Sequence, residues 1–246
     1  MRVLICGNGA REKYLAELCP RRGHSTPDHG PWDMAVLPLP RSSLSEDVAD
    51  QLPRGQKIVC GMTDAAFDKL AEKRGWKPLR VLSDEIYTQE NASLTAEGAL
   101  FTAVARMNRA LRGSQCLVIG YGRIGKALTR LLWVMGATVT VAARREESRQ
   151  EAGENSVSIR EMPQVLPRMD AVFNTVPAPV LGKEELRHVR PSCVLIDLAS
   201  APYGIDMDAA EALGLKAFLE SGLPGRYCPL SAAETLLNYM EREGSA

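Results

Sequence analysis

The feature that most constrains the fold is a short apolar run that passes into spaced glycines. Residues 116–125 read Cys-Leu-Val-Ile-Gly-Tyr-Gly-Arg-Ile-Gly, and apolar residues at helical spacing continue to Met135. This pattern predicts a buried parallel strand, a tight turn and a helix. Such a turn presents backbone N–H groups and the positive end of a helix to a pyrophosphate. A Rossmann-type dinucleotide-binding sheet is therefore expected.

Each glycine of this turn has a separate expected role. Gly120 permits the turn, Gly122 lets the phosphates approach the backbone, and Gly125 lets the helix pack closely on the strand. A glycine turn that binds nothing is the alternative, but the strand before it and the helix after it favour binding. The predicted cofactor contacts are Gly120, Tyr121, Gly122, Arg123, Ile124 and Gly125.

The end of the next expected strand, Ala137–Ala142, indicates which dinucleotide is bound. An acidic residue there would bind the ribose hydroxyls of NAD, whereas this chain has Arg144 and Arg145. Guanidinium groups suit the 2′-phosphate of NADP. Arg145 could instead begin a solvated helix, so Arg144, nearest the strand end, is the stronger candidate. The expected cofactor is NADP(H).

Bulk composition argues against several classes of partner. The chain has 246 residues, with 30 basic and 30 acidic side chains, so no net charge favours nucleic acid or an anionic membrane. No apolar run approaches the ~20 residues of a membrane span. The start, Met1–Gly7, enters a strand directly and lacks the apolar core of a secretory signal. A cytoplasmic protein is expected.

The cysteines and histidines predict no metal site. None of the 6 cysteines forms a Cys-x-x-Cys pair, and none of the 3 histidines is spaced as part of a ligand pair. Most of the cysteines lie in strand-like runs, as buried, reduced thiols do.

The pattern along the chain predicts an α/β fold of two α/β domains. Residues 1–90 form a smaller, flavodoxin-like, substrate-side domain, and residues 91–228 form the NADP-binding Rossmann domain with a doubly wound parallel sheet. A long helix, Ala92–Leu111, joins the two domains. A last helix, Ser231–Arg242, is expected to fold back, so that residues 229–246 pack on the first domain. The first-domain strands are expected at Val3–Cys6, Met34–Leu37, Lys57–Cys60 and Arg80–Leu82.

Further contacts with the cofactor are expected where two later strands end. In an open α/β sheet the ligand lies beyond the carboxyl ends of the strands. The nicotinamide half should therefore meet Thr175, Val176 and Pro177 after one strand, and Ala199 and Ser200 after the next. The neighbouring Asn174 and Asp197 could equally be residues that cap strand ends.

The substrate side carries weaker signals. Free amides at Gly61, Met62 and Thr63 could hold a carboxylate, although Thr63 could be a plain helix cap. Asn91, at the expected start of the joining helix, faces the cleft with Thr95 and Glu97, or these are a cap and buried polar residues. Arg226 is a candidate carboxylate clamp. Gly7–Arg11 is interpreted as an ordinary strand-to-helix turn. The catalytic group is unknown, because His24, His29 and His188 make unconvincing bases.

Several of these stretches together resemble one enzyme family, the A subunit of dipicolinate synthase. The resemblance covers about residues 90–235 and is weak before them. The stretches that carry it are Leu117–Gly125 with Ala142–Arg144, Asp170–Pro177, Leu195–Ser200 with Gly204 and Asp206, Gly222–Arg226 with Pro229, and Asn91 with Thr95, Glu97 and Gly98.

The resemblance implies an activity. It implies an NADP(H)-dependent oxidoreductase that forms dipicolinate from a (hydroxy-)tetrahydrodipicolinate- or dihydrodipicolinate-type dicarboxylate, in the mother cell of a sporulating bacterium. It also implies a partner, a flavoprotein-like B subunit, and a homo-oligomer is expected. Hydride removal that yields an aromatic ring needs no strong base, which agrees with the scarcity of acid–base groups.

Other interpretations stay open. The glycine motif also occurs in 2-hydroxyacid dehydrogenases, but those use a catalytic histidine, and no histidine follows His188. A shikimate dehydrogenase-like enzyme would share the arginine-ended strand and Asn174–Pro177, but needs a Lys-Asp pair that no motif near Lys57, Lys69 or Lys73 supplies. A non-enzymatic alternative is a regulatory protein that binds NADPH and acts on a partner.

Overall fold

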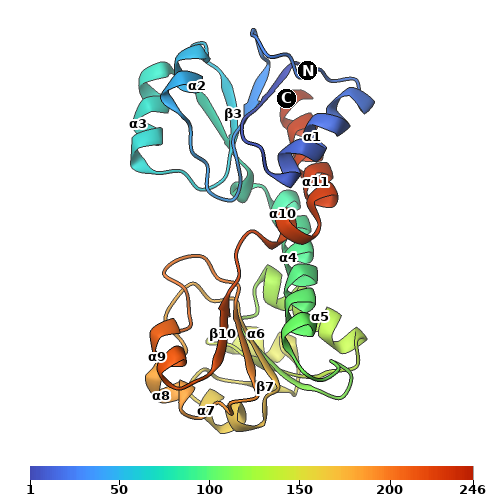
Figure 1. Cartoon of the computed structure of the whole chain (residues 1–246), viewed down its shortest axis with the longest axis vertical. Coiled ribbons are helices and arrows are strands. Elements are labelled where there is room, and N and C mark those ends of the chain that lie inside the picture. The colour runs from blue at the N-terminus through green and yellow to red at the C-terminus, as the bar shows by residue number, and fades with distance from the viewer. Residues whose placement is uncertain (246) are drawn as a thin grey trace. The chain divides into compact units, whose positions relative to one another are not determined.

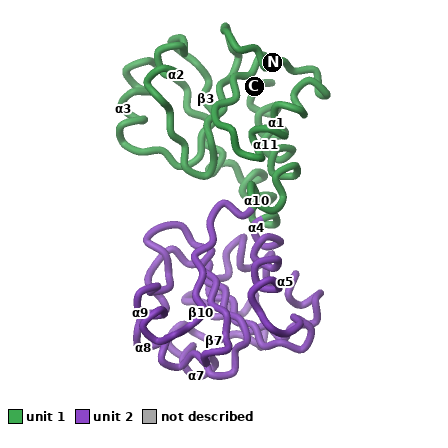
Figure 2. Tube along the Cα trace, viewed as in Figure 1, with its two compact units in different colours: residues 1–94, 224–246 green, residues 95–223 purple. Residues whose placement is uncertain are grey.

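The computed structural model describes residues 1–245, which form two compact α/β units (Figure 2). Unit 1 contains residues 1–94 and the chain from Pro224 onward, and unit 2 contains Thr95–Leu223. Both sheets are parallel throughout, so the predicted class of two parallel α/β domains is confirmed.

Unit 2 is built on a 6-stranded parallel sheet with the order β10-β9-β8-β5-β6-β7. Its two edge strands, β10 and β7, are labelled in Figure 1. The chain first moves outward through β5, β6 and β7, then returns to the other side of β5 with β8, β9 and β10, which is the doubly wound Rossmann order. The strands are β5 Gln115–Ile119, β6 Thr138–Ala142, β7 Ser156–Val157, β8 Ala171–Asn174, β9 Val194–Asp197 and β10 Lys216–Leu219.

Helices cover both faces of this sheet. They are α5 Arg123–Val134, α6 Glu146–Ala152, α7 Met162–Val165, α8 Lys183–Leu186 and α9 Met207–Ala212, with a 3-10 turn at Leu166–Arg168. Leu117, Val172 and Leu195 from neighbouring strands are fully buried, and Leu186 and Ala210 pack in the same cluster. Continuous apolar strands are expected where helices cover both sides of a parallel sheet.

Unit 1 has a 4-stranded parallel sheet with the order β1-β2-β3-β4. The strands are β1 Val3–Ile5, β2 Met34–Val36, β3 Lys57–Cys60 and β4 Lys77–Arg80. On the outer side of β1, Ser25 forms a parallel bridge with Arg2. Counting that bridge as the second strand in chain order gives the 2-1-3-4-5 order of flavodoxin-like sheets. The chain therefore reverses direction at β1, between Ser25 and β2.

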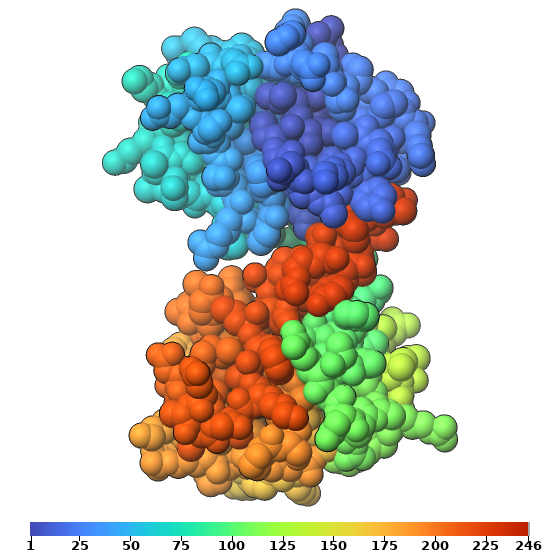
Figure 3. Space-filling model, viewed as in Figure 1, coloured from blue at the N-terminus to red at the C-terminus, as the bar shows by residue number. Residues whose placement is uncertain are grey.

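The helices of unit 1 lie in two layers. They are α1 Ala10–Arg21, α2 Glu46–Gln51, α3 Ala65–Arg74, the short α10 Leu223–Tyr227 and α11 Pro229–Ser245. Leu15 of α1 and Leu236 of α11 pack with Val36 and Val59 on one face, while Phe67 of α3 packs with Ile58 on the other. The C-terminal helix thus completes the core beside α1, and their surfaces adjoin in Figure 3.

The last strand of unit 1 lies earlier than expected. The prediction Arg80–Leu82 was wrong: β4 ends at Arg80, and Val81–Ser83 forms a 3-10 turn. Pro78 lies inside β4, and its missing N–H is tolerated because β4 is the edge strand of the sheet. Val81 is buried as part of the turn, whereas Leu82 is exposed.

The joining helix also begins earlier than expected. α4 runs from Glu85 to Arg106, whereas Ala92–Leu111 was predicted. The Asp84 carboxylate accepts a hydrogen bond of 2.6 Å from the Tyr87 N–H and caps the helix start. The helix passes from unit 1 into unit 2, as predicted. Among residues 1–245, no helix combines the length and the apolar character that a bilayer span requires.

Candidate functional site

The glycine turn after β5 is closely packed at two of its positions. Gly120 has a φ of +93°, and a Cβ added there would lie 2.4 Å from the Thr175 hydroxyl oxygen. A Cβ at Gly125 would lie 2.2 Å from the Gly120 carbonyl oxygen. Neither position can hold a side chain without displacing its neighbours, as the glycine spacing predicted for a tight turn and a close helix–strand approach.

Gly122 is different, because a Cβ added there would have no atom within 4 Å. Gly122 is the N-cap residue of α5 and supplies no capping side chain. The amides of the first helical turn, which includes Arg123 and Ile124, have no acceptor within their own helix. An open space in front of an uncapped helix start fits a pyrophosphate group, which these amides would bind.

Thr175 joins the ends of β5 and β8. Its amide and its hydroxyl both donate to the Ile119 carbonyl, each at 2.9 Å. These are the two strands between which the chain order of the sheet reverses, and dinucleotides bind at that point in such folds. Val176 is partly exposed and Pro177 is exposed beside the turn, where contact with a cofactor stays a prediction.

A buried polar network supports the same edge of the sheet. Asn174 and Asp197 are both fully buried, and the Asn174 amide donates to the Asp197 carboxylate at 2.8 Å. That carboxylate also accepts the N–H groups of Ala199, Gly204 and Ile205 at 3.0, 2.7 and 2.8 Å. The network holds the loops after β8 and β9 in place, so both side chains position neighbouring backbone.

The loop after β9 carries the other predicted cofactor contacts. Ala199 is buried and Ser200 is exposed. The Ser200 carbonyl accepts a hydrogen bond of 3.0 Å from the Tyr203 N–H, and Tyr203 has a φ of 65°. A left-handed conformation is uncommon for a bulky residue, so this loop has a specific, constrained shape.

The two arginines after β6 are both exposed. Within residues 1–245, neither guanidinium makes a hydrogen bond or an ion pair. Arg145 is the N-cap residue of α6. Arg149 supports this loop but was not predicted as part of the site. Its guanidinium donates to the Ala143 and Arg144 carbonyls at 2.9 and 2.8 Å. It thereby orders the backbone from which Arg144 projects.

Tyr121 of the glycine turn leans toward the same strand. It packs against Val141, Ala143 and Ala152, and the Lys126 ammonium lies 5.6 Å from the centre of its ring. Its ring therefore lies between the glycine turn and the arginine-bearing loop, which is where the adenosine half of a dinucleotide is expected.

The free amides expected at Gly61 and Met62 are not free. The Gly61 N–H donates to the Ser42 hydroxyl at 2.8 Å, and the Met62 N–H donates to the Pro40 carbonyl at 2.9 Å. Thr63 is not a helix cap, because Asp64 caps α3. The Thr63 hydroxyl instead takes a hydrogen bond from Arg80 at 2.6 Å. The N–H groups of Gly61 and Met62 are therefore bonded to residues 40–42, and neither is available to bind a carboxylate.

The predicted polar residues of the joining helix all lie on α4. Asn91 was expected to begin the helix, which was wrong, since α4 starts at Glu85 and Asn91 is an interior residue. Thr95 is buried and Glu97 is exposed. Asn91 and Thr95 are one turn apart, so they share a face of the helix. Their contact with substrate stays a prediction.

The predicted clamp, Arg226, is exposed and stacks on Tyr227, with its guanidinium carbon 5.2 Å from the ring centre. Sequence reasoning missed a different guanidinium close to it. Arg11, in the first turn of α1, is only 5% exposed, and its Nε is buried with no hydrogen-bond partner. The only sequence signal for Arg11 was its place after the turn that follows β1.

Comparison with known proteins shows the family to which the chain belongs. Residues 86–215 match the family model described as "D-isomer specific 2-hydroxyacid dehydrogenase, NAD binding domain". The chain is 30% identical over 202 residues to the dipicolinate synthase A subunit of Bacillus subtilis (strain 168), covering 81% of this chain and 68% of that protein. The chain belongs to the family of dipicolinate synthase A subunits. Its dinucleotide-binding domain is a member of the 2-hydroxyacid dehydrogenase NAD-binding family.

Solved structures of the family share the fold. The dipicolinate synthase A subunit from Bacillus halodurans has a TM-score of 0.89 at 24% identity, covering 100% of this chain and 98% of that chain. The apo D-lactate dehydrogenase of Escherichia coli has a TM-score of 0.65 at 15% identity, covering 100% of this chain and 98% of that chain. The fold and family are thus those of nicotinamide-dependent dehydrogenases.

In this chain, burial keeps three of the cysteine thiols in the protonated form at neutral pH. Burial raises the pKa of the Cys6 and Cys116 thiols to about 11, and that of Cys193 to about 12. His24 is held between the N-terminal amine and Glu241, at 3.2 and 2.9 Å. Within the described chain, no group of His, Cys, Asp and Glu side chains is arranged to bind a metal ion.

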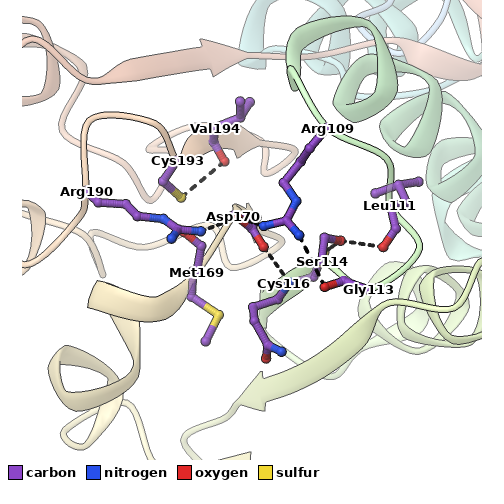
Figure 4. Close-up of polar contacts among 11 residues, drawn as sticks. Arg109, Leu111, Gly113, Ser114, Cys116, Met169, Asp170, Arg190, Cys193 and Val194 are labelled. Carbon is purple, nitrogen blue, oxygen red and sulfur yellow. Dashed lines mark hydrogen bonds and ion pairs between the residues drawn. The ribbon is translucent and has the colours of Figure 1, made fainter.

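A second charged cluster lies at the opposite, amino edge of the unit 2 sheet (Figure 4). The buried Asp170 carboxylate accepts from Arg109 at 2.8 Å, from Arg190, and from the Gln115 N–H at 2.8 Å. Arg190 also donates to the Met169 carbonyl. The cluster ties the starts of β5 and β8 together, so we assign Asp170 a structural role.

Proposed function

We propose that this chain is an NADP(H)-dependent oxidoreductase that forms dipicolinate from a partly reduced pyridine dicarboxylate. The observation that carries the proposal is the dinucleotide cradle of Gly120–Gly125, with Arg144 and Arg145 at the end of β6, in a member of the dipicolinate synthase A family. The substrate class follows from the family relationship.

The preference for NADP rests on charge at the end of β6. No acidic side chain follows Ala143 at the position that would bind the ribose hydroxyls of NAD. Instead, two exposed guanidinium groups without partners in residues 1–245 stand there. Arg149 fixes the backbone between them and the strand. A 2′-phosphate would give these groups the charge-assisted, forked hydrogen bonds that guanidinium favours.

The chain's residues bind and orient, and the cofactor supplies the redox chemistry. The nicotinamide ring, when bound, accepts a hydride. The amides at the start of α5 would hold the pyrophosphate, and Thr175 and Val176 would border the nicotinamide half. Loss of a hydride from a dihydropyridine also releases a proton, which aromatisation makes acidic. A strong base is therefore not required of the chain.

The cellular setting belongs to the same proposal. A relative whose name describes one subunit of a synthase supports a partner chain, which we propose is the flavoprotein-like B subunit. We further propose a homo-oligomer that acts in the mother cell of a sporulating bacterium.

Two incubations test the reaction. Purified protein is mixed with NADP+ and freshly made hydroxy-tetrahydrodipicolinate, with and without the B subunit. The absorbance of reduced cofactor and the formation of dipicolinate are followed together. We expect both products in equal amounts. Absence of both products from the two mixtures would contradict the proposed reaction.

Cofactor choice is tested separately by fluorescence titration with NADPH and NADH. Arg144→Ala should weaken NADPH binding by about 10- to 100-fold, because a charge-assisted hydrogen bond contributes about 1.5–3 kcal/mol, and should leave NADH binding almost unchanged. Arg145→Ala should have a smaller effect of the same kind. Arg168→Ala, an exposed arginine at the amino edge of the sheet, is the control. Equal affinity of the unaltered protein for NADH and NADPH would contradict the NADP assignment.

A regulatory, nicotinamide-binding protein is a second candidate, favoured by the scarcity of acid–base groups near the turn. It predicts NADPH binding without turnover of any dicarboxylate, and a change in a partner's activity when NADPH is added. The incubation with and without the B subunit separates the two candidates.

A further inference from the structure

Among residues 1–245, Arg11 is a buried guanidinium whose charge the fold leaves unpaired. The residue is 5% exposed, and its Nε is buried with no hydrogen bond. No carboxylate of the described chain forms an ion pair with it. Burying an unpaired charge is costly. Proteins tolerate that cost chiefly where the charge has a use, as at a binding site.

Its position in the fold is the position where α/β sheets bind ligands. Arg11 lies in the first turn of α1, which begins directly beyond the carboxyl end of β1. The chain order reverses at β1, because Ser25 lies on one side of it and β2 on the other. Ligands of open α/β sheets bind outside the carboxyl ends of the strands at such a reversal.

The start of α1 adds to the positive field at this place. Gly9 is the N-cap residue of α1 and contributes no capping side chain. The amides of the first turn have no acceptor in the helix, and the helix dipole is positive there. A buried guanidinium without an ion pair and an uncapped helix start both favour an anion, and they lie within one helical turn. The buried Glu12 carboxylate lies at the same helix start, beside Gly9, and offsets part of this positive field.

The guanidinium of Arg11 is held in place by packing against the backbone of α10. A Cβ added at Gly225 would lie 3.1 Å from an Arg11 terminal nitrogen, so the guanidinium lies directly against the glycine backbone of α10. Burial raises the pKa of the Tyr87 hydroxyl, and the nearby charge of Arg11 opposes that rise. Glu12 is buried as well, but it lies toward Gly9 and makes no ion pair with Arg11 in the described residues.

We propose that Arg11 and the uncapped amino end of α1 form the carboxylate-binding site of unit 1. The ligand class is a small organic carboxylate, held by the forked N–H groups of Arg11 and by first-turn amides. The inference rests on the proposed function only in taking the ligand to be the dicarboxylate substrate. It replaces Gly61 and Met62, whose amides are already bonded, and is preferred to the exposed Arg226.

The first test is the stability of the protein without ligand. Arg11→Met removes an unpaired buried charge and keeps most of the side-chain volume. The melting temperature should stay the same or rise, because no partner is lost. A structural arginine behaves in the opposite way, so a clear fall in the melting temperature, or a failure to fold, would overturn the proposal.

The second test is ligand binding to the full chain by calorimetry and thermal shift. Dipicolinate, picolinate, isophthalate, succinate and inorganic phosphate are the probes. Arg11→Met and Arg11→Lys should each weaken carboxylate binding by roughly tenfold or more, the lysine variant because it keeps the charge but loses the fork. Lys13→Gln, which removes one exposed charge from the same helix, is the matched control and should stay within about twofold of the unaltered protein.

The outcomes separate this inference from the proposed function. If succinate or isophthalate binds in an Arg11-dependent way and dipicolinate does not, the carboxylate site stands and the dipicolinate proposal fails. If dipicolinate binds equally well to the unaltered protein and to Arg11→Met, the site is overturned while the proposed function stands. If none of the carboxylates binds, or if phosphate binds as tightly as they do, the site is overturned.

Discussion

The glycines of the turn after β5 look alike in sequence, but they meet different surroundings. Gly120 and Gly125 are confined by the Thr175 hydroxyl and by a carbonyl oxygen, whereas Gly122 borders open space. The first two positions therefore have no room for a side chain, whereas a side chain at the third would occupy the space that we propose for the pyrophosphate. The distinction follows from the distance to the nearest atom at each position.

This difference predicts two opposite mutant phenotypes. Gly125→Ala should lower the free energy of unfolding by about 1–3 kcal/mol, because its Cβ would overlap a backbone oxygen that cannot easily move. Gly122→Ala should cost under about 1 kcal/mol of stability, as a small change at an N-cap, but should weaken NADPH binding by roughly tenfold or more, because the methyl group would occupy the phosphate space. Urea unfolding and NADPH titration measure the two effects. Equal stability losses in both variants would contradict the assignment.

At the scale of elements, a small charged cluster adds to the apolar packing between α11 and the N-terminal part of the chain. Glu241 accepts from Arg22 at 2.6 Å and from His24 at 2.9 Å. Partial burial raises the pKa of the Glu241 carboxyl, but the hydrogen bond from His24 and the charge and hydrogen bond of Arg22 outweigh it and lower the pKa overall. The carboxylate form is therefore favoured in the folded state.

The sign of the pH effect follows from that lowered pKa. A group whose pKa is lower in the folded state contributes stability above its unfolded value, and that stability is lost as the pH falls through the folded value. At neutral pH, Glu241→Gln should lower the free energy of unfolding by about 0.5–1 kcal/mol, since the cluster is partly exposed. As the pH falls below the usual pKa of a glutamate carboxyl and through the lowered pKa of Glu241 in the folded state, the variant and the unaltered protein should converge.

Urea unfolding at a series of pH values measures this convergence. Glu234→Gln, an exposed carboxyl on the same helix, is the control and should show no such loss at neutral pH. A difference between Glu241→Gln and the unaltered protein that does not change with pH would contradict the account.

For the whole molecule, the two units differ in how the chain builds them. Unit 1 is discontinuous, since its core contains Leu236, Leu237 and Met240 from α11 together with Val3 and Leu15. The last residues of the chain therefore complete a core that the first residues begin. Unit 2 is a single continuous stretch.

Removal of α11 should therefore damage unit 1 alone. A chain that ends at Cys228 exposes the α11-facing side of the unit 1 core, and the unit should lose its cooperative unfolding. Trp32 and Trp76, which are 7% and 5% exposed, lie in unit 1, whereas Trp133 in unit 2 is 54% exposed. A red shift of the tryptophan emission, with NADPH binding retained, is the expected result. Removal of residues 245–246 only is the control, and unchanged emission after loss of α11 would contradict the prediction.

Local patterns were enough to predict much of this molecule. The apolar runs, the glycine spacing and the arginine-ended strand are each visible within a few neighbouring residues. Burial and backbone geometry restrict which residue types can stand at such neighbouring positions. The parallel, doubly wound class of the large sheet also followed from the alternation of strands and helices. The ends of two elements were predicted wrongly. The end of β4 depends on its place at the edge of the sheet, and the start of α4 depends on the cap that Asp84 provides.

The partners of individual polar groups could not be predicted in this way. The amides of Gly61 and Met62 are taken by residues 40–42, and Asn174 meets Asp197 only because β8 and β9 are neighbours. Arg11 looks like an ordinary surface arginine in the sequence, whereas in the fold it is buried and lies against Gly225 of α10. A hydrogen bond requires two groups within about 3 Å, and which distant groups come that close is settled by the packing of the entire unit.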